Sequence, residues 1–190
     1  MQISKDNIQR SFSKASKTYE SSAIVQNTMA YELIDFLPKK SFDTVLEIGC
    51  GTGLLSSLLL NDLKLSSLTL NDLSLDMLNL CKEKFKDTKL FKENKLSFLQ
   101  ADADSLELHD NYSLIISNAC FQWLKKLEGD LLNYVEHLQK EGILAFTIFS
   151  KDNFYELREC SGVSLEYIDK STLKKILKKT HCAFDIEKIE

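Results

Sequence analysis

The sequence lacks several features that would assign it to a large class of proteins. It contains no run of roughly eighteen apolar residues and opens on a polar, amphipathic segment, so we expect neither a transmembrane helix nor a signal peptide. Its five cysteines are scattered and include no C-x-x-C pair, which argues against a disulfide framework and a zinc site. Its three histidines share no metal-ligand spacing. We therefore expect a cytoplasmic protein without a bound metal.

Arginine is also scarce: only Arg10 and Arg158 occur among 24 basic residues, so either could serve where a planar, forked cation is needed. The formal net charge of −4 gives no general attraction to nucleic acid, and we expect neither nucleic acid nor a membrane as partner. The lysine pairs at 174–175 and 178–179 have helical spacing and indicate a solvated face, with a polyanion site as the weaker alternative. A length of 190 residues suits one domain, 1–190.

Glycine is rare but concentrated, because three of the six glycines lie within five residues. Gly49, Gly51 and Gly53 follow the apolar run 44–48 and precede a helical pattern, which predicts a strand, a tight turn and a helix. A dinucleotide-binding turn would need its third glycine at Leu54. Glu47, two residues before the first glycine, disfavours a pyrophosphate and favours a cationic ligand. The segment resembles motif I of the class I methyltransferases, whose cofactor S-adenosyl-L-methionine carries a sulfonium and an ammonium.

Short apolar runs alternate with helical patterns along the rest of the chain, which predicts a parallel sheet with helices on both faces. We expect an α/β, Rossmann-like class I methyltransferase sheet, with the ligand at the carboxyl ends of the strands. Residues 2–37 predict two helices, so that 1–40 form a helical cap over a core of 41–190. The expected strands are 44–48, 67–70, 96–100, 112–118, 142–149 and 183–188, and the expected helices are 54–62, 75–86, 127–139 and 171–180.

Acidic residues follow the second and third expected strands. Asp72 lies about twenty residues beyond the glycine turn, where a carboxylate can accept hydrogen bonds from both ribose hydroxyls. Asp102 can accept a hydrogen bond from the adenine amine while the backbone N–H of Ala103 donates to a ring nitrogen. Asp104 is the competing choice for the adenine contact.

The remaining cofactor contacts are expected around the first and fourth strands. Glu47 and Gly49 should meet the ammonium and methionine part of the cofactor, and backbone at Asn118 should face the same part. Gly51 and Gly53 are also expected at the cofactor, where the lack of a side chain permits close approach. Phe121 and Trp123 follow closely and are candidates for the apolar wall of the transfer site, with a plain core role as the alternative for Trp123.

Four segments carry a narrower resemblance. These segments are the N-terminal block 8–20, L-E-I-G-C-G-T-G at 46–53, S-N-A-C-F-Q-W at 117–123 and F-S-K-D-N-F-Y-E-L-R at 149–158. Together they resemble the malonyl-acyl-carrier-protein O-methyltransferases of biotin synthesis. The resemblance implies methylation of the free carboxylate of a malonyl thioester, carried by acyl carrier protein or by coenzyme A. We expect Tyr19 to act as a lid residue over the cofactor and Arg158 to bind the substrate, each with structural packing as the alternative.

The sequence departs from the family pattern at two places. Ser150 and Lys151 replace the usual glycine-proline pair, and the chain stops after the expected strand 183–188, so we expect the sheet to lack the family's last strand. Two other functions stay open: another small-molecule O-, N- or C-methyltransferase, and a non-catalytic subunit that binds S-adenosylmethionine.

Overall fold

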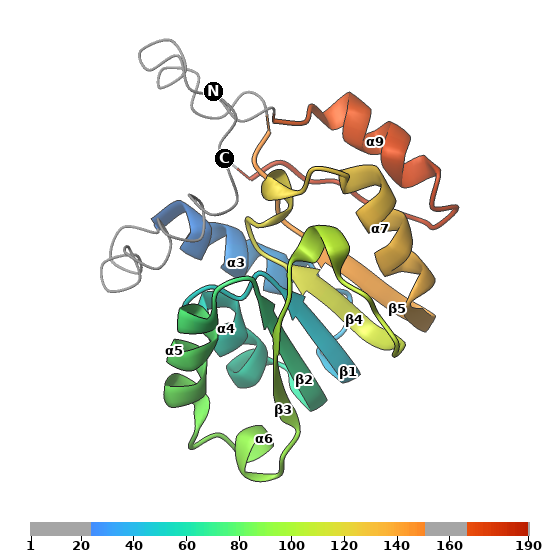
Figure 1. Ribbon diagram of the computed structural model, residues 1–190. Coiled ribbons are helices and arrows are strands. Elements are labelled where there is room, and N and C mark those ends of the chain that lie inside the picture. Colours follow the sequence, from blue (N-terminus) through green and yellow to red (C-terminus); the bar gives the residue numbers. More distant parts are fainter. Residues whose placement is uncertain (1–23, 151–166, 190) are drawn as a thin grey trace, which may run out of the picture.

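The computed structural model describes residues 24–150 and 167–189, and the fold is given for these residues (Figure 1). Five parallel strands form one sheet in the order β3-β2-β1-β4-β5. The strands are β1 Ser41–Ile48, β2 Lys64–Asp72, β3 Leu96–Gln100, β4 Tyr112–Ser117 and β5 Leu138–Phe146. The helices are α3 Ile24–Phe36, α4 Leu54–Asp62, α5 Leu75–Phe85, α6 Lys89–Lys92, α7 Leu127–Glu136 and α9 Lys170–Lys178, with single 3-10 turns η1 Ala103–Ser105 and η2 Phe121–Trp123.

The order of the strands places a reversal between β1 and β4. From β1 the chain builds outward through β2 to β3, then crosses back to form β4 and β5 on the other side of β1. At such a reversal the loops after neighbouring strands separate and leave a crevice at their carboxyl ends. The predicted Rossmann-like parallel sheet is confirmed in these five strands.

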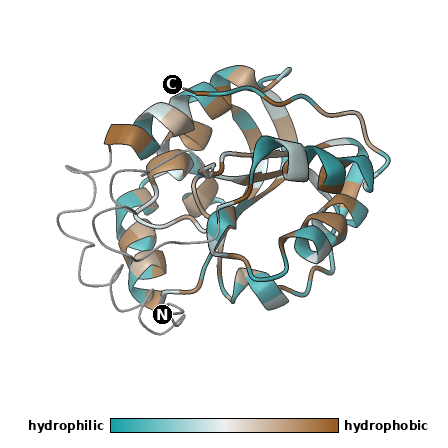
Figure 2. Cartoon of the chain, turned by 90° about the horizontal axis from the view of Figure 1, so that it is seen from above, coloured by the Kyte–Doolittle hydropathy of each residue, from teal (hydrophilic) through white to brown (hydrophobic). Residues whose placement is uncertain are grey.

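Apolar side chains alternate between the two faces of the sheet, and each face carries its own helices. Val45 of β1 packs in one cluster with α3, α4 and α5, while Leu46 packs in a second cluster with α7 and α9. All six residues of β4 are buried, as expected for a central strand covered on both faces. In the view from above, the helices carry both hydrophilic and hydrophobic residues (Figure 2).

The predicted fifth strand is misplaced by several residues. We expected α7 to run to 139 and the strand to begin at 142, but the helix ends at Glu136 and β5 begins at Leu138. The pairing of β5 with β4 shifts register just after this start, and Glu141 in the irregular stretch has φ 61°. Lys140, Glu141 and Gly142 lie inside the strand, in the stretch where its register with β4 shifts.

The predicted strand 183–188 is wrong, because residues 183–189 form no strand and do not pair with β5. Phe184 and Ile186 instead pack against the cluster beneath α7 and α9. In the described part of the chain β5 is therefore an edge strand. Of the two predicted N-terminal helices, α3 is present and the other lies outside the described residues, so the division at residue 40 stays a prediction.

Candidate S-adenosylmethionine site

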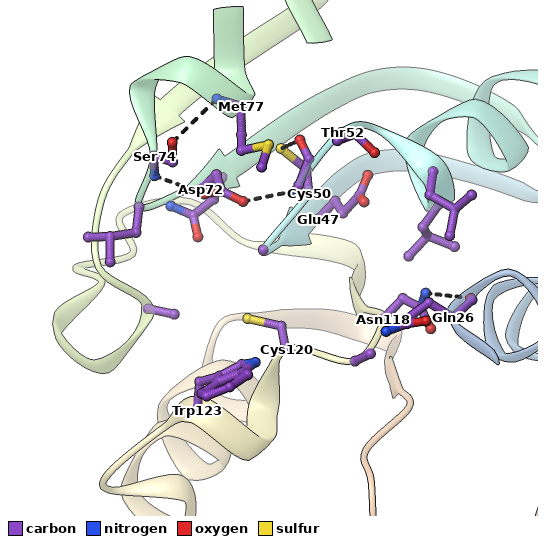
Figure 3. Close-up of a pocket in the computed structure, with 18 of the residues that line it drawn as sticks. Gln26, Glu47, Cys50, Thr52, Asp72, Ser74, Met77, Asn118, Cys120 and Trp123 are labelled. Carbon is purple, nitrogen blue, oxygen red and sulfur yellow. Dashed lines mark hydrogen bonds between the residues drawn. The ribbon is translucent and has the colours of Figure 1, made fainter. Parts of the chain in front are cut away.

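A cavity lies at the carboxyl ends of β1, β2, β3 and β4, where the strand order predicts a ligand (Figure 3). In the described part of the chain its charged lining residues are all acidic, and its remaining wall is mostly apolar or glycine. It is lined by Gln26, Glu47, Gly49, Cys50, Gly51, Thr52, Leu54, Leu55, Asn71, Asp72, Leu73, Ser74, Met77, Ala101, Asp102, Ala103, Asn118, Ala119, Cys120, Trp123 and Leu124.

Glu47 is the most deeply buried charged residue of the cavity, with 1% of its surface exposed. Its Oε2 accepts a hydrogen bond of 2.6 Å from the hydroxyl of Ser56 on α4. Burial raises the pKa of Glu47 to about 8, although the hydrogen bond from Ser56 opposes the shift. A cation placed beside this carboxyl would recover the ionised form, so Glu47 suits an ammonium and not a phosphate.

The three glycines of the turn have different roles. Gly51 has φ 53°, and a Cβ placed there would meet no atom within 4 Å, so it borders open space where a ligand can approach the backbone. A Cβ at Gly49 would collide with the side chain of Cys120. A Cβ at Gly53 would lie 2.8 Å from the ring of Phe85, and Gly53 is not part of the cavity lining. The predicted cofactor contact of Gly53 is untested, and the structure gives this glycine a packing role.

Asp72 joins the end of β2 to the glycine turn. Its Oδ2 accepts a hydrogen bond of 2.8 Å from the N–H of Gly51, and its Oδ1 accepts one of 2.8 Å from the N–H of Ser74. Burial raises the pKa of Asp72, and the backbone hydrogen bonds oppose that shift. Each carboxylate oxygen has a second lone pair, so Asp72 can also accept hydrogen bonds from two hydroxyls in the cavity.

Asn71, which was not among the predicted site residues, holds the end of β3 against β2. Asn71 is buried, and its amide donates to the carbonyl oxygens of Leu99 at 3.1 Å and Ala101 at 3.0 Å. This contact positions Asp102 and Ala103, both of which line the cavity. Asp104, the competing choice for the adenine contact, is not among the lining residues, and its Oδ1 accepts from the N–H of Lys125 at 2.7 Å.

A chain of hydrogen bonds from Thr147, which directly follows β5, to α3 supports the cavity wall at Asn118 and Ala119. The hydroxyl of Thr147 donates to Oδ1 of Asn118 at 2.6 Å and accepts from the N–H of Ala119 at 2.9 Å. The amide of Asn118 donates to the carbonyl oxygen of Gln26 in the first turn of α3 at 3.0 Å. Ala119 has φ 50°, a conformation that costs a non-glycine residue energy, and its contact with Thr147 helps to hold it there.

Cys120 and Trp123 lie across the cavity from Glu47 and Asp72 (Figure 3). Burial raises the pKa of Cys120 to about 12, so its thiol is neutral at physiological pH. Phe121, the other aromatic candidate for this wall, is fully buried and stacks on Tyr134 with ring centroids 5.6 Å apart. Phe121 therefore packs in the core beneath the wall that Trp123 forms.

The structure brings most of the predicted cofactor residues together in one cavity: Glu47, Gly49, Gly51, Asp72, Asp102, Ala103 and Asn118. Tyr19 and Arg158 lie outside the described residues, so their roles stay predictions. The residues that sequence analysis missed act by supporting others, as Ser56, Asn71 and Thr147 do. None of these three forms a motif with a neighbour in sequence, because each finds its partner through the fold.

The strand order, the glycine turn after β1 and the acidic residue at the end of β2 define a class I methyltransferase. A family model described as a methyltransferase domain matches residues 45–142, and the cofactor of this class is S-adenosylmethionine. The residues fit it, because the charged side chains that line the cavity in ranges 24–150 and 167–189 are all acidic, which suits a sulfonium and an ammonium.

Among curated proteins, the chain is 37% identical over 183 residues to malonyl-[acyl-carrier protein] O-methyltransferase 2 of Ilyobacter polytropus, a match that covers 92% of this chain and 69% of that protein. It is 34% identical to malonyl-[acyl-carrier protein] O-methyltransferase of Calditerrivibrio nitroreducens, over 83% of this chain and 60% of that protein. The chain belongs to the malonyl-acyl-carrier-protein O-methyltransferase family. It spans 60–69% of the length of these two relatives.

Solved structures agree on the fold. A putative methyltransferase in complex with the Haloferax volcanii Trm112 methyltransferase activator superposes with a TM-score of 0.73 at 18% identity, covering 90% of this chain and 73% of that one. At this identity the likeness supports the fold alone. In the described ranges 24–150 and 167–189, no helix is both long and apolar enough to cross a membrane.

Proposed function

We propose that the protein transfers a methyl group from S-adenosylmethionine to the free carboxylate of a malonyl thioester in biotin synthesis, with acyl carrier protein or coenzyme A as the carrier. The observation that carries this proposal is the acidic cavity at the strand reversal, in a chain whose relatives are named malonyl-[acyl-carrier protein] O-methyltransferases. When bound, S-adenosylmethionine supplies the methyl group and a neutral thioether as leaving group.

The cavity provides positions for the cofactor's polar groups. Ionised Glu47 would hold the ammonium, Asp72 the ribose hydroxyls, and Asp102 with the N–H of Ala103 the adenine edge. Gly51 lets the backbone approach the ligand, since no side chain fills the space beside it. Asp72 also accepts a hydrogen bond from the N–H of Gly51, so the carboxylate proposed for the ribose is tied to the glycine turn.

The reaction requires little acid–base chemistry from the protein. A malonyl carboxylate has a pKa near ~4, so it is already an ionised nucleophile at neutral pH and needs no general base. Alignment of the carboxylate with the methyl group and the leaving sulfur can supply roughly 7–11 kcal/mol. Trp123 and Leu124 give the cavity an apolar wall that excludes water, which favours a transition state in which opposite charges neutralise each other.

The cavity also contains thiols that must not compete for the methyl group. The pKa of Cys120 is raised to about 12 by burial, and that of Cys50 is raised by its contact with Cys81, whose sulfur is 3.9 Å away. Both thiols therefore stay protonated, and a protonated thiol is a poor nucleophile. At neutral pH the two thiols are therefore not competing acceptors for the methyl group.

Tyr19 and Arg158 remain proposals for the substrate side. Tyr19 would close over the cofactor, and Arg158 would pair with the malonyl carboxylate through its two-pronged guanidinium. Arg158→Lys keeps the positive charge but cannot bind a carboxylate through two parallel N–H groups. It should therefore lower kcat/KM for the malonyl thioester and leave the affinity for S-adenosylmethionine nearly unchanged.

The test is mass spectrometry of malonyl-acyl carrier protein and malonyl-coenzyme A incubated with the protein and S-adenosylmethionine. We expect a mass gain of one methylene unit on the malonyl group, and none with acetyl thioesters, which have no free carboxylate. Absence of the ester despite measurable binding of S-adenosylmethionine would reject this function and favour the non-catalytic subunit.

A further inference from the structure

Helix α9 presents an unusually basic face. It has the sequence Lys-Ser-Thr-Leu-Lys-Lys-Ile-Leu-Lys, with four lysines and no acidic residue, and Lys179 follows directly. Leu173, Ile176 and Leu177 are buried against the core, and all the lysines are exposed on the opposite side of the helix. The spacing of four residues places Lys170, Lys174 and Lys178 in one row along the helix.

Four of these five lysines have no ion pair within the described part of the chain. Lys179 pairs with Glu128 of α7 at 2.7 Å, but within the described ranges no ion pair joins Lys170, Lys174, Lys175 or Lys178 to an acidic group. Three exposed lysines around α5 and α6 differ, because Lys86 pairs with Glu83 at 3.0 Å, Lys89 with Glu93, and Lys92 with Asp87.

The row of lysines destabilises α9 through repulsion between like charges. Like charges four residues apart destabilise a helix, and Lys170 also places a positive charge at the helix N-terminus. The helix is held by Asp169, which accepts hydrogen bonds from the N–H groups of Ser171 and Thr172, and by its buried apolar side. A concentrated positive face on a chain of net charge −4 is therefore better explained by an external partner than by folding.

The face lies on the same side of the sheet as one wall of the cavity. The buried residues of α9 share a hydrophobic cluster with α7 and with Phe121 of η2, and η2 also contributes Trp123 to the cavity. Figure 1 shows α9 beside α7, on one side of the sheet. A partner bound to α9 would sit next to the elements that build the transfer site.

We propose that the lysine face of α9, centred on Lys170, Lys174 and Lys178, docks the acidic surface of the protein that carries the malonyl thioester. This inference rests on the proposed function. The three lysines span about 12 Å along the helix axis, which matches about two turns of a partner helix. A long polyanion such as nucleic acid would extend past this short row onto a protein that is acidic overall, so an acidic protein surface is the better fit.

The experiment compares two triple variants that lower the formal net charge equally. Lys170→Gln/Lys174→Gln/Lys178→Gln removes the proposed dock, and Lys86→Gln/Lys89→Gln/Lys92→Gln is the matched control. Each variant is assayed with malonyl-acyl carrier protein and with malonyl-pantetheine, which has no acidic carrier. We expect the α9 variant to lower kcat/KM about tenfold for the carrier-bound substrate, mainly through KM and less so at high salt. Activity on malonyl-pantetheine should stay within about twofold of wild type.

Arginine at the same three positions should preserve activity, since it keeps the charge. The docking proposal is overturned if the α9 variant loses no more than the control, or if it loses activity equally on both substrates. If the wild-type protein methylates neither substrate, the proposed function fails. The docking proposal is then tested by measuring the binding of labelled acyl carrier protein by fluorescence anisotropy. An α9 variant that binds this probe about tenfold more weakly supports the dock. Unchanged affinity for this probe, with weakened binding of a single-stranded DNA oligonucleotide, overturns it.

Discussion

The buried carboxyl of Glu47 makes stability depend on pH in a defined direction. Its pKa is about 8 in the folded protein, against an ordinary value of 4.5, so the folded state binds an extra proton between these values. The contribution of Glu47 to stability is therefore most favourable below pH 4.5 and is lost as the pH rises to about 8. Glu47→Gln has no such proton, and its amide oxygen can still accept the hydrogen bond from Ser56.

The expected size is large enough to measure by urea unfolding. Over the two pH units from 5 to 7, the free energy of unfolding of the wild type should fall relative to Glu47→Gln by about 3 kcal/mol, at ~1.4 kcal/mol per unit. Both proteins share every other titrating group, so the difference between their pH profiles isolates this carboxyl. Parallel profiles from pH 5 to 8 would refute the reasoning.

The same carboxyl predicts proton release when the cofactor binds. A group with a pKa of about 8 is mostly protonated at pH 7, and it must ionise to pair with the ammonium. Calorimetry in buffers of different ionisation enthalpy should therefore detect release of about 0.9 proton per S-adenosylmethionine bound at pH 7. Glu47→Gln should bind more weakly and release almost none. No proton release by the wild type would remove Glu47 from the ammonium site.

Five further substitutions, at four positions, test other parts of the cavity and its supports. Asp72→Ala should weaken binding of S-adenosylmethionine about tenfold or more, because charged hydrogen bonds contribute roughly 1.5–3 kcal/mol each. An affinity measured by calorimetry within about threefold of wild type would contradict the ribose contact. Thr147→Val should lower the free energy of unfolding, measured with urea, by about 1–3 kcal/mol and should bind the cofactor more weakly. Thr147→Ser should preserve both the stability and the affinity. Identical behaviour of the two variants would exclude a role for the hydroxyl. Gly53→Ala should lower the free energy of unfolding by about 2 kcal/mol, because the added Cβ strains the backbone and collides with Phe85. Gly51→Ala should mainly reduce the calorimetric affinity for the cofactor. A loss of affinity without a loss of stability in Gly53→Ala would contradict its packing role.

The sequence predicts the fold well where its signals are local. The glycine turn marks the junction of β1 and α4, and the predicted helix 54–62 matches α4 at both ends. The predicted start of β5 was wrong because Lys140 and Glu141 are uncommon in strands, and only the pairing with β4 shows that the strand begins before them. The strand at 183–188 was also wrong, since an alternating pattern specifies a strand only when a neighbouring edge pairs with it.

The candidate site was predicted for residues that follow a strand or form a motif. Asp72 and Asp102 could be placed by their distance from the glycine turn and by the strands before them. Ser56, Asn71 and Thr147 could not, because a hydroxyl or amide in a helix or strand has many possible partners, and only the tertiary structure selects one. Gly53 illustrates the same limit, since its neighbour Phe85 comes from a different helix.

The position of β5 at the edge of the sheet has a consequence for amide hydrogen exchange. In a parallel strand alternate N–H groups point to opposite sides, so within the described chain every second amide of Ile143–Phe146 bonds to β4 and the others face away. Neighbouring residues of one strand should thus differ sharply in exchange rate, whereas both sets of amides in buried β4 should be protected. Any chain that pairs with this edge would slow the fast set alone, which gives a residue-level signal for association at β5.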